Sequence, residues 1–200
     1  MPHPPAPWQL NGELVVVPAF TAGRQVGGVM LADYTSGTLA YRELIVFSHA
    51  TTKGMVVSHI YVDDEQSMSG GREIWGLPKE LATFTYERDR FTARQGETTL
   101  LHATVRRRPG FLPIVIPTPI TSSAGQTIGR ARIKAAPALV ELQIPHTSPI
   151  AYLGLAGRHI ALAGDELRLH MPRPRVREAS AAQQRSPNSP QHRPVRDAAS

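Results

Sequence analysis

The sequence predicts a mainly β protein of the α+β class, with antiparallel strands arranged as a barrel or sandwich and a few short helices. Three observations predict this class: short runs of alternating apolar and polar residues recur, turn-forming residues separate them, and helical periodicity is confined to brief stretches. The chain has 200 residues, of which 41% are hydrophobic, and this is enough for one domain with a packed core.

The first half of the chain contains four expected strands, which are rich in β-branched and aromatic residues. Turn-forming residues lie between them at Thr35-Ser36-Gly37 and Lys53-Gly54. Such short connections favour antiparallel pairing, because parallel neighbours need a long crossover. The four strands are expected at residues 13–17, 26–33, 38–47 and 55–62.

The second half of the chain continues the β pattern, with a hairpin or meander followed by two last strands. These strands are expected at residues 83–88, 90–95, 98–107, 138–145 and 166–170. Helical material is short and is expected at residues 69–75, near 121–129 and at 150–156. A Pro-rich link is expected at residues 113–119.

The two ends of the chain differ in composition from its centre. Residues 1–7 are expected to form an extended Pro-rich N-terminal arm, and residues 8–172 form the expected domain. Residues 173–200 have almost no large apolar side chain, so we expect a disordered basic tail. Six arginines and two acids give this tail +4 of the net charge of +6, so the domain is nearly neutral and nucleic acid is an unlikely partner.

Several classes of site are excluded by the composition. The chain has no cysteine, so it has no disulfide, thiolate metal site or cysteine nucleophile. The eight histidines show no metal-ligand spacing, and there is no phosphate-binding glycine loop or G-x-S-x-G nucleophile motif. We see no signal peptide and no run of roughly 18 apolar residues, so we expect a cytoplasmic protein without a membrane partner.

The segment Gly70-Gly71-Arg72-Glu73-Ile74-Trp75-Gly76-Leu77-Pro78-Lys79 places one lysine after a glycine-rich turn and in apolar company. Lysine is scarce, since the chain has three lysines and nineteen arginines. A lysine amine can lose its proton and attack a carbonyl carbon, whereas a guanidinium effectively cannot. Lys79 is therefore the first candidate for a catalytic residue, and an ordinary surface lysine is the alternative.

The third expected strand places Glu43 in the interior. With a period of two, Tyr41, Glu43, Ile45 and Phe47 share one face, which is the bulkier apolar face. An ionised carboxylate buried there needs a partner, a polar cavity or a proton. Glu43 is the second candidate, and the alternatives are a salt bridge to an arginine of a neighbouring strand or burial of the opposite strand face.

Arg72 follows the glycine pair and is the third candidate. Its guanidinium could hold a substrate carboxylate through two parallel hydrogen bonds. The alternative is that Arg72 braces the loop before Lys79, and the residues alone leave both interpretations open.

The segment from Gly71 to Lys79 resembles the signature around the Schiff-base lysine of the acetoacetate decarboxylase superfamily. Tyr41-Arg42-Glu43 resembles the strand that carries the family's active-site glutamate, and Tyr61-Val62-Asp63-Asp64 also fits. The resemblance is close over residues 37–82 and thinner to about residue 170. It implies a β-barrel-like fold surrounded by helices, and frequently a homo-oligomer.

The resemblance implies that Lys79 forms an imine with a small β-keto acid like acetoacetate, which then loses carbon dioxide without a metal or organic cofactor. Glu43 would manage protons. A free amine is rare at pH 7, so we expect an apolar pocket to lower the pKa of Lys79, as is established for acetoacetate decarboxylase itself. The implied substrate contacts are Arg72, Tyr41, Trp75 and Leu77.

Two other functions stay open at the level of sequence. One is a Schiff-base aldolase or dehydratase, in which a pyruvate-like imine on Lys79 condenses with an aldehyde. The other is a non-catalytic barrel that binds a small ligand and uses Lys79 as a charged anchor. Glu80 stands where the classical decarboxylase has a second lysine, and in an extended segment it would point away from Lys79.

Overall fold

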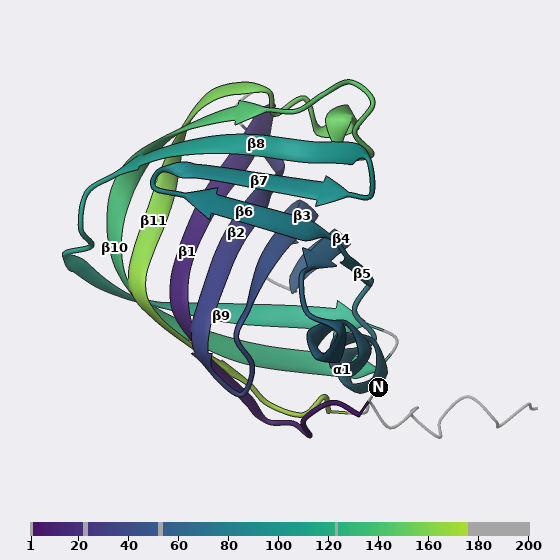
Figure 1. Ribbon diagram of the computed structural model, residues 1–200. Coiled ribbons are helices and arrows are strands. Elements are labelled where there is room, and N and C mark those ends of the chain that lie inside the picture. Colours follow the sequence, from purple (N-terminus) through teal and green to yellow (C-terminus); the bar gives the residue numbers. More distant parts are fainter. Residues whose placement is uncertain (1, 22–23, 52–53, 123, 176–200) are drawn as a thin grey trace, which may run out of the picture.

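The computed structural model of the chain describes residues 2–21, 24–51, 54–122 and 124–175 (Figure 1). The described residues form a mostly β structure, which confirms the predicted class. In the first part the elements are β1 (Trp8–Thr21), β2 (Arg24–Gly37), β3 (Tyr41–Thr51), β4 (Gly54–Val62), α1 (Glu65–Trp75) and β5 (Lys79–Leu81). In the second part they are β6 (Thr83–Glu87), β7 (Arg90–Gln95), β8 (Thr98–Arg107), β9 (Leu112–Ser122), β10 (Gly125–Gln143), a 3-10 helix (Ala151–Leu153) and β11 (Gly157–Met171).

Hydrogen bonds join the strands in the order β11-β1-β2-β3-β4-β9-β10-β8-β7-β6, and β10 also pairs with β11. Strands β1 to β4 pair antiparallel with their neighbours in sequence, as their short connections predict. Between β4 and β9 the described residues form a single pair, Met55 with Ile120. The pair between β4 and β9 and the pairing of β4 with β5 are parallel, and the other pairings are antiparallel. The predicted antiparallel arrangement is therefore confirmed for most of the sheet, whereas a closed barrel is not.

Two apolar cores lie on the two faces of the sheet. Strands β6, β7 and β8 lie across β1, β2 and β3 in Figure 1. The first core includes residues from both of these groups of strands, such as the fully buried Val17, Leu44 and Leu100. The second core includes Trp8 and Trp75 and has α1 beside it. Strand β3 is buried on both faces, because its alternate residues contribute to opposite sides.

Helix α1 begins after Asp64, whose side chain accepts a hydrogen bond from the Ser67 backbone N–H at 2.6 Å. It ends at Gly76, which adopts the left-handed conformation (φ 61°) typical of a glycine cap. The helix is longer than the predicted 69–75, because this cap starts it one turn earlier. The glycine pair at 70–71 lies inside the helix, so the predicted glycine-rich turn is wrong.

The predicted Pro-rich link at 113–119 and the predicted helical turn near 121–129 are also wrong. Residues 113–122 belong to β9 and residues 125–129 belong to β10, and the two strands pair antiparallel outward from Gly125 and Ser122. Proline has no backbone N–H and is tolerated in strands that are paired on one side only. Strand β9 has this character over most of its described length, because it meets β4 at one residue pair.

The predicted helix at 150–156 is reduced to the 3-10 turn between β10 and β11. The remaining strands occur where the sequence predicts them, although β1, β2, β10 and β11 extend well beyond the predicted bounds. Lys53, in the predicted turn after β3, lies outside the described residues.

The N-terminal arm contacts the domain. The Trp8 Nε1 donates to the Pro4 carbonyl at 2.9 Å, and the His3 Nε2 lies 2.9 Å from the Glu73 carboxylate. At the other end, Arg175 exchanges backbone hydrogen bonds with Gln126. The rest of the expected tail, residues 176–200, lies outside the described residues.

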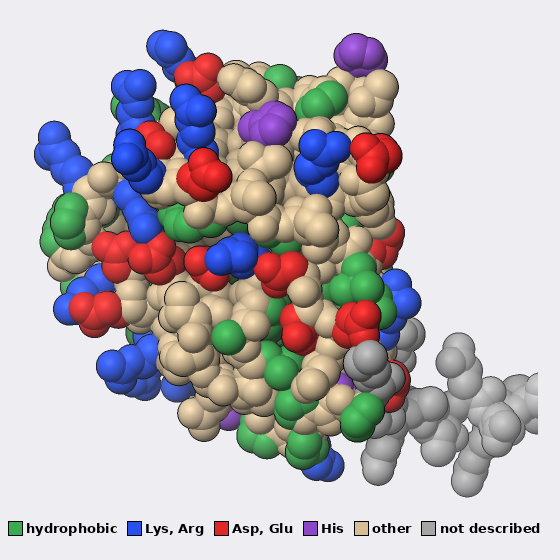
Figure 2. Space-filling model, in the orientation of Figure 1, with side chains coloured by type: hydrophobic (Ala, Val, Ile, Leu, Met, Phe, Trp, Pro, Cys, Tyr) green, Lys and Arg blue, Asp and Glu red, His purple; other side chains and the backbone are tan. Residues whose placement is uncertain are grey.

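On the face shown in Figure 2, cationic and acidic side chains are interspersed, and they form no continuous stripe of one charge. In the part of the chain that the structure describes, no helix has the length and apolar character needed to span a bilayer.

Candidate active site

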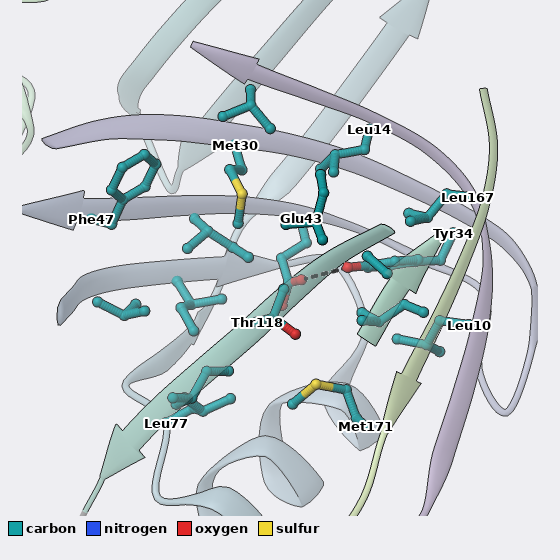
Figure 3. Close-up of a pocket in the computed structure, with 18 of the residues that line it drawn as sticks. Leu10, Leu14, Met30, Tyr34, Glu43, Phe47, Leu77, Thr118, Leu167 and Met171 are labelled. Carbon is teal, nitrogen blue, oxygen red and sulfur yellow. Dashed lines mark hydrogen bonds between the residues drawn. The ribbon is translucent and has the colours of Figure 1, made fainter. Parts of the chain in front are cut away.

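A cavity of about 680 Å³ lies on the α1 side of the sheet. Its walls come from β1 to β4, β9 to β11 and the segment from Trp75 to Lys79. Most of the lining side chains are apolar, as the close-up in Figure 3 shows. The polar side chains that line it are few: Tyr34, Tyr41, Glu43, Lys79 and Thr118.

The segment after α1 positions the Lys79 side chain in this cavity. Gly76 ends the helix, and its backbone N–H donates to the Arg72 carbonyl at 3.0 Å. Pro78 follows two residues later and prevents the helix from continuing. Lys79 then begins β5, which runs parallel to β4 and pairs Lys79 with Ile60.

The two glycines of α1 allow the helix to approach the site closely. A Cβ atom on Gly71 would lie 2.4 Å from the Lys79 Cδ, and one on Gly70 would lie 2.5 Å from the Trp8 Cζ2. Both distances are far below van der Waals contact. Gly71 therefore makes room for the aliphatic part of the lysine side chain, and Gly70 makes room for the indole ring.

The Lys79 Nζ is surrounded by oxygen atoms. It forms an ion pair with the Glu43 Oε1 at 2.7 Å and donates to the Ser67 Oγ at 3.0 Å and to the Tyr41 hydroxyl at 3.3 Å. The side chain of Lys79 is 4% exposed and that of Glu43 is 5% exposed. The nitrogen also lies 4.9 Å from the centroid of the Tyr41 ring, which is within range for a cation–π contact.

Glu43 contacts one cation, Lys79, and one neutral hydrogen-bond donor, Tyr34. On β3 it points into the cavity, where one oxygen faces Lys79. The Tyr34 hydroxyl donates to the other oxygen, Oε2, at 3.2 Å, and this bond is drawn in Figure 3. Tyr34 reaches it from β2, which pairs with β3 in a register that places Tyr34 opposite Tyr41.

The pKa of Lys79 does not follow the sequence-based expectation. Burial is the largest single influence and lowers this pKa, but the Glu43 carboxylate and Tyr41 together outweigh it, so the pKa lies above its ordinary value of 10.5. Burial also raises the pKa of Tyr41 to about 12, and the nearby Glu43 carboxylate adds to that effect. The predicted lowering of the lysine pKa by an apolar pocket is therefore wrong.

The structure brings together five of the six residues that the sequence suggested. Arg72 is the exception, because it is exposed and is not among the residues that line the cavity. Its Nε donates to the Lys79 carbonyl at 2.6 Å, so it braces the segment that carries the lysine. This corrects the interpretation of Arg72 as a substrate contact. The five residues that line the cavity are Tyr41, Glu43, Trp75, Leu77 and Lys79.

Glu80 points away from the site. Its Oε2 accepts a hydrogen bond from the Gln95 Nε2 at 2.7 Å, on the side of β5 opposite to the cavity. Adjacent residues of a strand face opposite ways, as expected. Glu80 therefore does not compete with Glu43 for the Lys79 amine.

Sequence reasoning missed Ser67 and Tyr34. Ser67 lies four residues before Gly71 and so on the same face of α1, a relation that the predicted start at residue 69 concealed. Tyr34 lies opposite Tyr41 across the connection between β2 and β3. Strand periodicity could therefore have placed both side chains on the same face of the sheet. Among the described residues, no group of three or more His, Cys, Asp or Glu side chains lies close enough to hold a metal ion.

Comparison with known families gives one match. A family model described as acetoacetate decarboxylase matches residues 14–113, which is half of the chain. This region contains β2, β3, α1 and β5, and thus Tyr41, Glu43 and Lys79. Among curated proteins, no sequence matches the chain.

Solved structures show where the fold recurs. The acetoacetate decarboxylase of Legionella pneumophila subsp. pneumophila strain Philadelphia 1 aligns with a TM-score of 0.57 and 18% identity, covering 86% of this chain and 90% of that chain. A second acetoacetate decarboxylase structure aligns with a TM-score of 0.55 and 13% identity, covering 86% and 88%. The enduracididine biosynthesis enzyme MppR aligns with a TM-score of 0.54 and 12% identity, covering 84% and 86%. At these identities the comparisons show a shared fold.

Proposed function

Because this chain belongs to the acetoacetate decarboxylase family, we propose that it is a Schiff-base lyase that decarboxylates a β-keto acid through an imine on Lys79. The observation that carries the proposal is the buried pair of Lys79 and Glu43, 2.7 Å apart, inside an apolar cavity. A nucleophile and a proton acceptor within hydrogen-bond reach are the arrangement that covalent catalysis needs.

The raised pKa of Lys79 makes Glu43 the base of the first step. A lysine with such a pKa is an ammonium at neutral pH and cannot attack a carbonyl carbon. Transfer of one proton across 2.7 Å to Glu43 leaves a neutral amine and a neutral carboxylic acid. Because both side chains are nearly fully buried, this transfer removes two buried charges at once, which limits its cost.

Imine formation then uses the same proton. The Lys79 nitrogen adds to the carbonyl carbon of the substrate, and one proton of the amine moves to the former carbonyl oxygen to give a carbinolamine. A second proton, from the acid, lets this oxygen leave as water and leaves a protonated imine. Glu43, which holds the proton from Lys79, is the nearest described donor for this step. When the imine carries its positive charge, the Glu43 carboxylate is its counter-ion and Tyr34 holds that carboxylate in place.

Loss of carbon dioxide is favoured by the charge balance of the cavity. Lys79 is the one cationic side chain among the described residues of the lining, and Glu43 already balances it. A substrate carboxylate therefore has no cation of its own, and a buried anion without a partner is costly. When the carbon–carbon bond breaks, its electron pair moves to the iminium to give an enamine, and the anion becomes neutral carbon dioxide. Protonation of the enamine carbon and hydrolysis release a ketone and the amine.

A second candidate is a Schiff-base aldolase or dehydratase. One solved structure of MppR, with a TM-score of 0.51 and 12% identity, is described as complexed with the condensation product of pyruvate and imidazole 4-carboxaldehyde. A similar fold thus accommodates two joined reactants. In this chain such a reaction would start from the same Lys79 imine and end in a new carbon–carbon bond in place of carbon dioxide release.

A third candidate is a non-catalytic small-molecule binder. The raised pKa of Lys79 favours it, since a permanent ammonium is a suitable anchor for a ligand oxygen. Such a protein would bind keto acids reversibly and form no covalent bond. Assembly as a homo-oligomer and a cytoplasmic location remain predictions from the sequence and its resemblance.

Release of carbon dioxide from acetoacetate and from longer β-keto acids tests the proposal, with the spontaneous rate subtracted. We expect the wild-type chain to accelerate release and Lys79→Arg, which retains the positive charge, to reduce it to background. Lys134→Arg is the matched control, since the Lys134 side chain is 51% exposed and lies outside the cavity lining. Equal rates for wild type and Lys79→Arg would refute the lyase, and new carbon–carbon bonds formed from pyruvate and an aldehyde would favour the second candidate.

A further inference from the structure

The cavity is much larger than acetoacetate requires. Acetoacetate has seven non-hydrogen atoms, and at the roughly 30 Å³ that one water occupies in the liquid, these need about 200 Å³. The cavity holds about 680 Å³, within the range of roughly 300–1,000 Å³ typical of pockets for drug-sized ligands. A small keto acid would leave most of this space to water or empty.

Four of the five polar side chains of the cavity, Tyr34, Tyr41, Glu43 and Lys79, form one cluster of contacts. The register of β1, β2 and β3 arranges their inward side chains in rows across the sheet. Glu43 belongs to the row that contains Leu14, next to the Tyr34–Tyr41 pair. Beyond it the rows contain no polar side chain: first Val16, Met30 and Ile45, then Pro18, Gly28 and Phe47.

These apolar rows give the cavity a direction. Glu43 and Phe47 lie four residues apart on β3, which is about 13 Å at about 3.3 Å per residue. In the view of Figure 3, Met30 and Phe47 lie on one side of Glu43, and Leu10 and Leu167 lie on the other. The wall between Glu43 and Phe47 can therefore contact a chain that leads away from the reactive nitrogen.

The same wall lacks any group that would hold a second charge. Tyr34, Tyr41, Glu43 and Lys79 already contact one another, and Thr118 is the other polar side chain among the described residues that line the cavity. The Thr118 hydroxyl is buried without a hydrogen-bond partner in the described part of the chain and could accept or donate one hydrogen bond, but it carries no charge. An ionised tail would therefore be buried without a counter-ion, which is costly. An apolar tail would gain free energy from the same burial.

We propose that the substrate carries a long apolar chain on its carbonyl carbon, and that this chain lies along the rows that end at Phe47. At about 1.2 Å per bond of an extended chain, 13 Å accommodates about eleven bonds. The substrate class is thus a medium-chain β-keto acid and the product a medium-chain methyl ketone. The inference rests on the proposed function, because the imine on Lys79 fixes the end from which the chain extends.

Methyl ketones of increasing length test this inference without the decarboxylation step. Acetone, 2-pentanone, 2-heptanone and 2-nonanone present the same carbonyl group to Lys79, and borohydride reduces the imine to a stable amine. The concentration of ketone that gives half-maximal trapping at Lys79 should fall about 4-fold per added methylene, or about 200-fold from acetone to 2-heptanone. Half-saturation that stays within 3-fold across the series would overturn the inference.

A variant that fills the apolar row adds a second test. Ile45→Phe places a larger side chain between Glu43 and Phe47 and should cut the 2-nonanone to acetone preference at least 10-fold. The matched control, Val115→Phe, adds the same ring outside the cavity and should keep the preference of the wild type. An unchanged preference in folded Ile45→Phe would show that the chain does not lie along this row and would overturn the inference.

Tryptophan fluorescence distinguishes failure of this inference from failure of the proposed function. The chain has two tryptophans, Trp8 and Trp75, and both line the cavity. Emission that responds to long ketones at low concentration, with no trapped imine for any ketone, would refute the lyase and retain the ligand class. Imines that form equally well with all ketones would retain the lyase and refute the ligand class.

Discussion

At the scale of single residues, the pKa of Lys79 depends on Glu43 as well as on burial. Burial alone would lower the pKa of the lysine, but the carboxylate at 2.7 Å and the Tyr41 hydroxyl reverse the direction. Lys79 and Glu43 thus form an ion pair, and in the proposed mechanism the free amine appears when the proton moves to Glu43. An apolar pocket seen from sequence suggests the opposite resting state, because the sequence does not show which carboxylate the lysine contacts.

Replacing Glu43 by Gln should lower the pKa of Lys79. The variant retains the size of the side chain but removes the counter-ion, so burial becomes the dominant influence. The pH at which borohydride trapping of acetone reaches half of its maximum should therefore move to lower pH than in the wild type. Glu80→Gln is the control, since Glu80 bonds to Gln95 away from the cavity. A profile of Glu43→Gln that coincides with the wild type would contradict this account of the pair.

Replacing Lys79 should destabilise the fold as well as abolish imine formation. Lys79→Met leaves Glu43 buried without its cation, and breaking a buried pair in this way costs about 3–5 kcal/mol. The double variant Lys79→Met with Glu43→Gln should recover part of this loss, because no uncompensated charge remains. Urea unfolding at neutral pH gives the free energy of unfolding of both variants. If Lys79→Met were as stable as the wild type, the ion pair would have to be open to water.

The raised pKa of Lys79 also predicts a loss of stability in alkali. A group whose pKa is higher in the folded chain stabilises fully below its unfolded pKa, here 10.5, and loses that contribution as the pH rises through the folded value. Tyr41, with a pKa raised to about 12, acts in the same direction above pH 10. The free energy of unfolding of the wild type should therefore fall above about pH 10.5, and more steeply than that of Lys79→Met. Parallel curves for the two proteins would contradict the raised lysine pKa.

At the scale of elements, strand periodicity predicted the β3 half of the site and missed the α1 half. Tyr41 and Glu43 point into the cavity as their alternation predicts, because a period of two survives in a curved sheet. Helix α1 has weaker signals, since its start depends on the Asp64 cap and its two glycines resemble a turn. The helix residues that contact Lys79 are close to it in sequence. Which face of the helix they lie on depends on where the helix begins, and the sequence did not show that start.

Gly71→Ala tests the close contact between α1 and the lysine. Alanine favours a helix over glycine by about 1 kcal/mol, so propensity alone predicts a more stable protein. The added Cβ would lie 2.4 Å from the Lys79 Cδ, so we expect displacement of Lys79 and at least a 10-fold slower imine trapping. Gln66→Ala on the exposed face of the same helix is the control. A variant that traps acetone as fast as the wild type would show that the helix does not position the lysine.

At the scale of the whole molecule, the sheet separates a site from a stabilising layer. Arg107 on β8 bonds to Glu13 on β1 and to Asp165 on β11, and so ties strands β6 to β8 to the rest of the sheet. These groups are partly exposed and lie outside the cavity lining. Because the two sides of the sheet are separate, we expect that the free energy of unfolding and the rate of imine formation at Lys79 can be changed independently.

Arg107→Met should reduce stability and leave imine formation unchanged. Two partly exposed ion pairs are lost, each worth about 1 kcal/mol or less, so we expect a loss of about 1–2 kcal/mol in urea unfolding. Trapping at Lys79, measured well below the unfolding transition, should match the wild type. A folded Arg107→Met protein with altered trapping would show that the two sides of the sheet are coupled.

The class of the fold was predictable from composition and periodicity, but the cavity was not. Its size depends on how far β9, β10 and β11 curve away from β3, and strands distant in sequence set that distance. The prolines of β9 suggested a link, because a strand with one paired side has the same composition. The resemblance over residues 37–82 therefore predicted Lys79 and Glu43 as site residues but not the apolar walls of the cavity.

Peptide mapping after treatment with acetone and borohydride tests the central claim most directly. Lys134 is an internal control, because its side chain is 51% exposed and pairs with Glu166 at the surface. We predict that the irreversible mass increase falls on the peptide that contains Lys79 and that Lys134 stays unmodified. Modification of Lys134 with Lys79 unmodified, or no modification at all, would contradict the account.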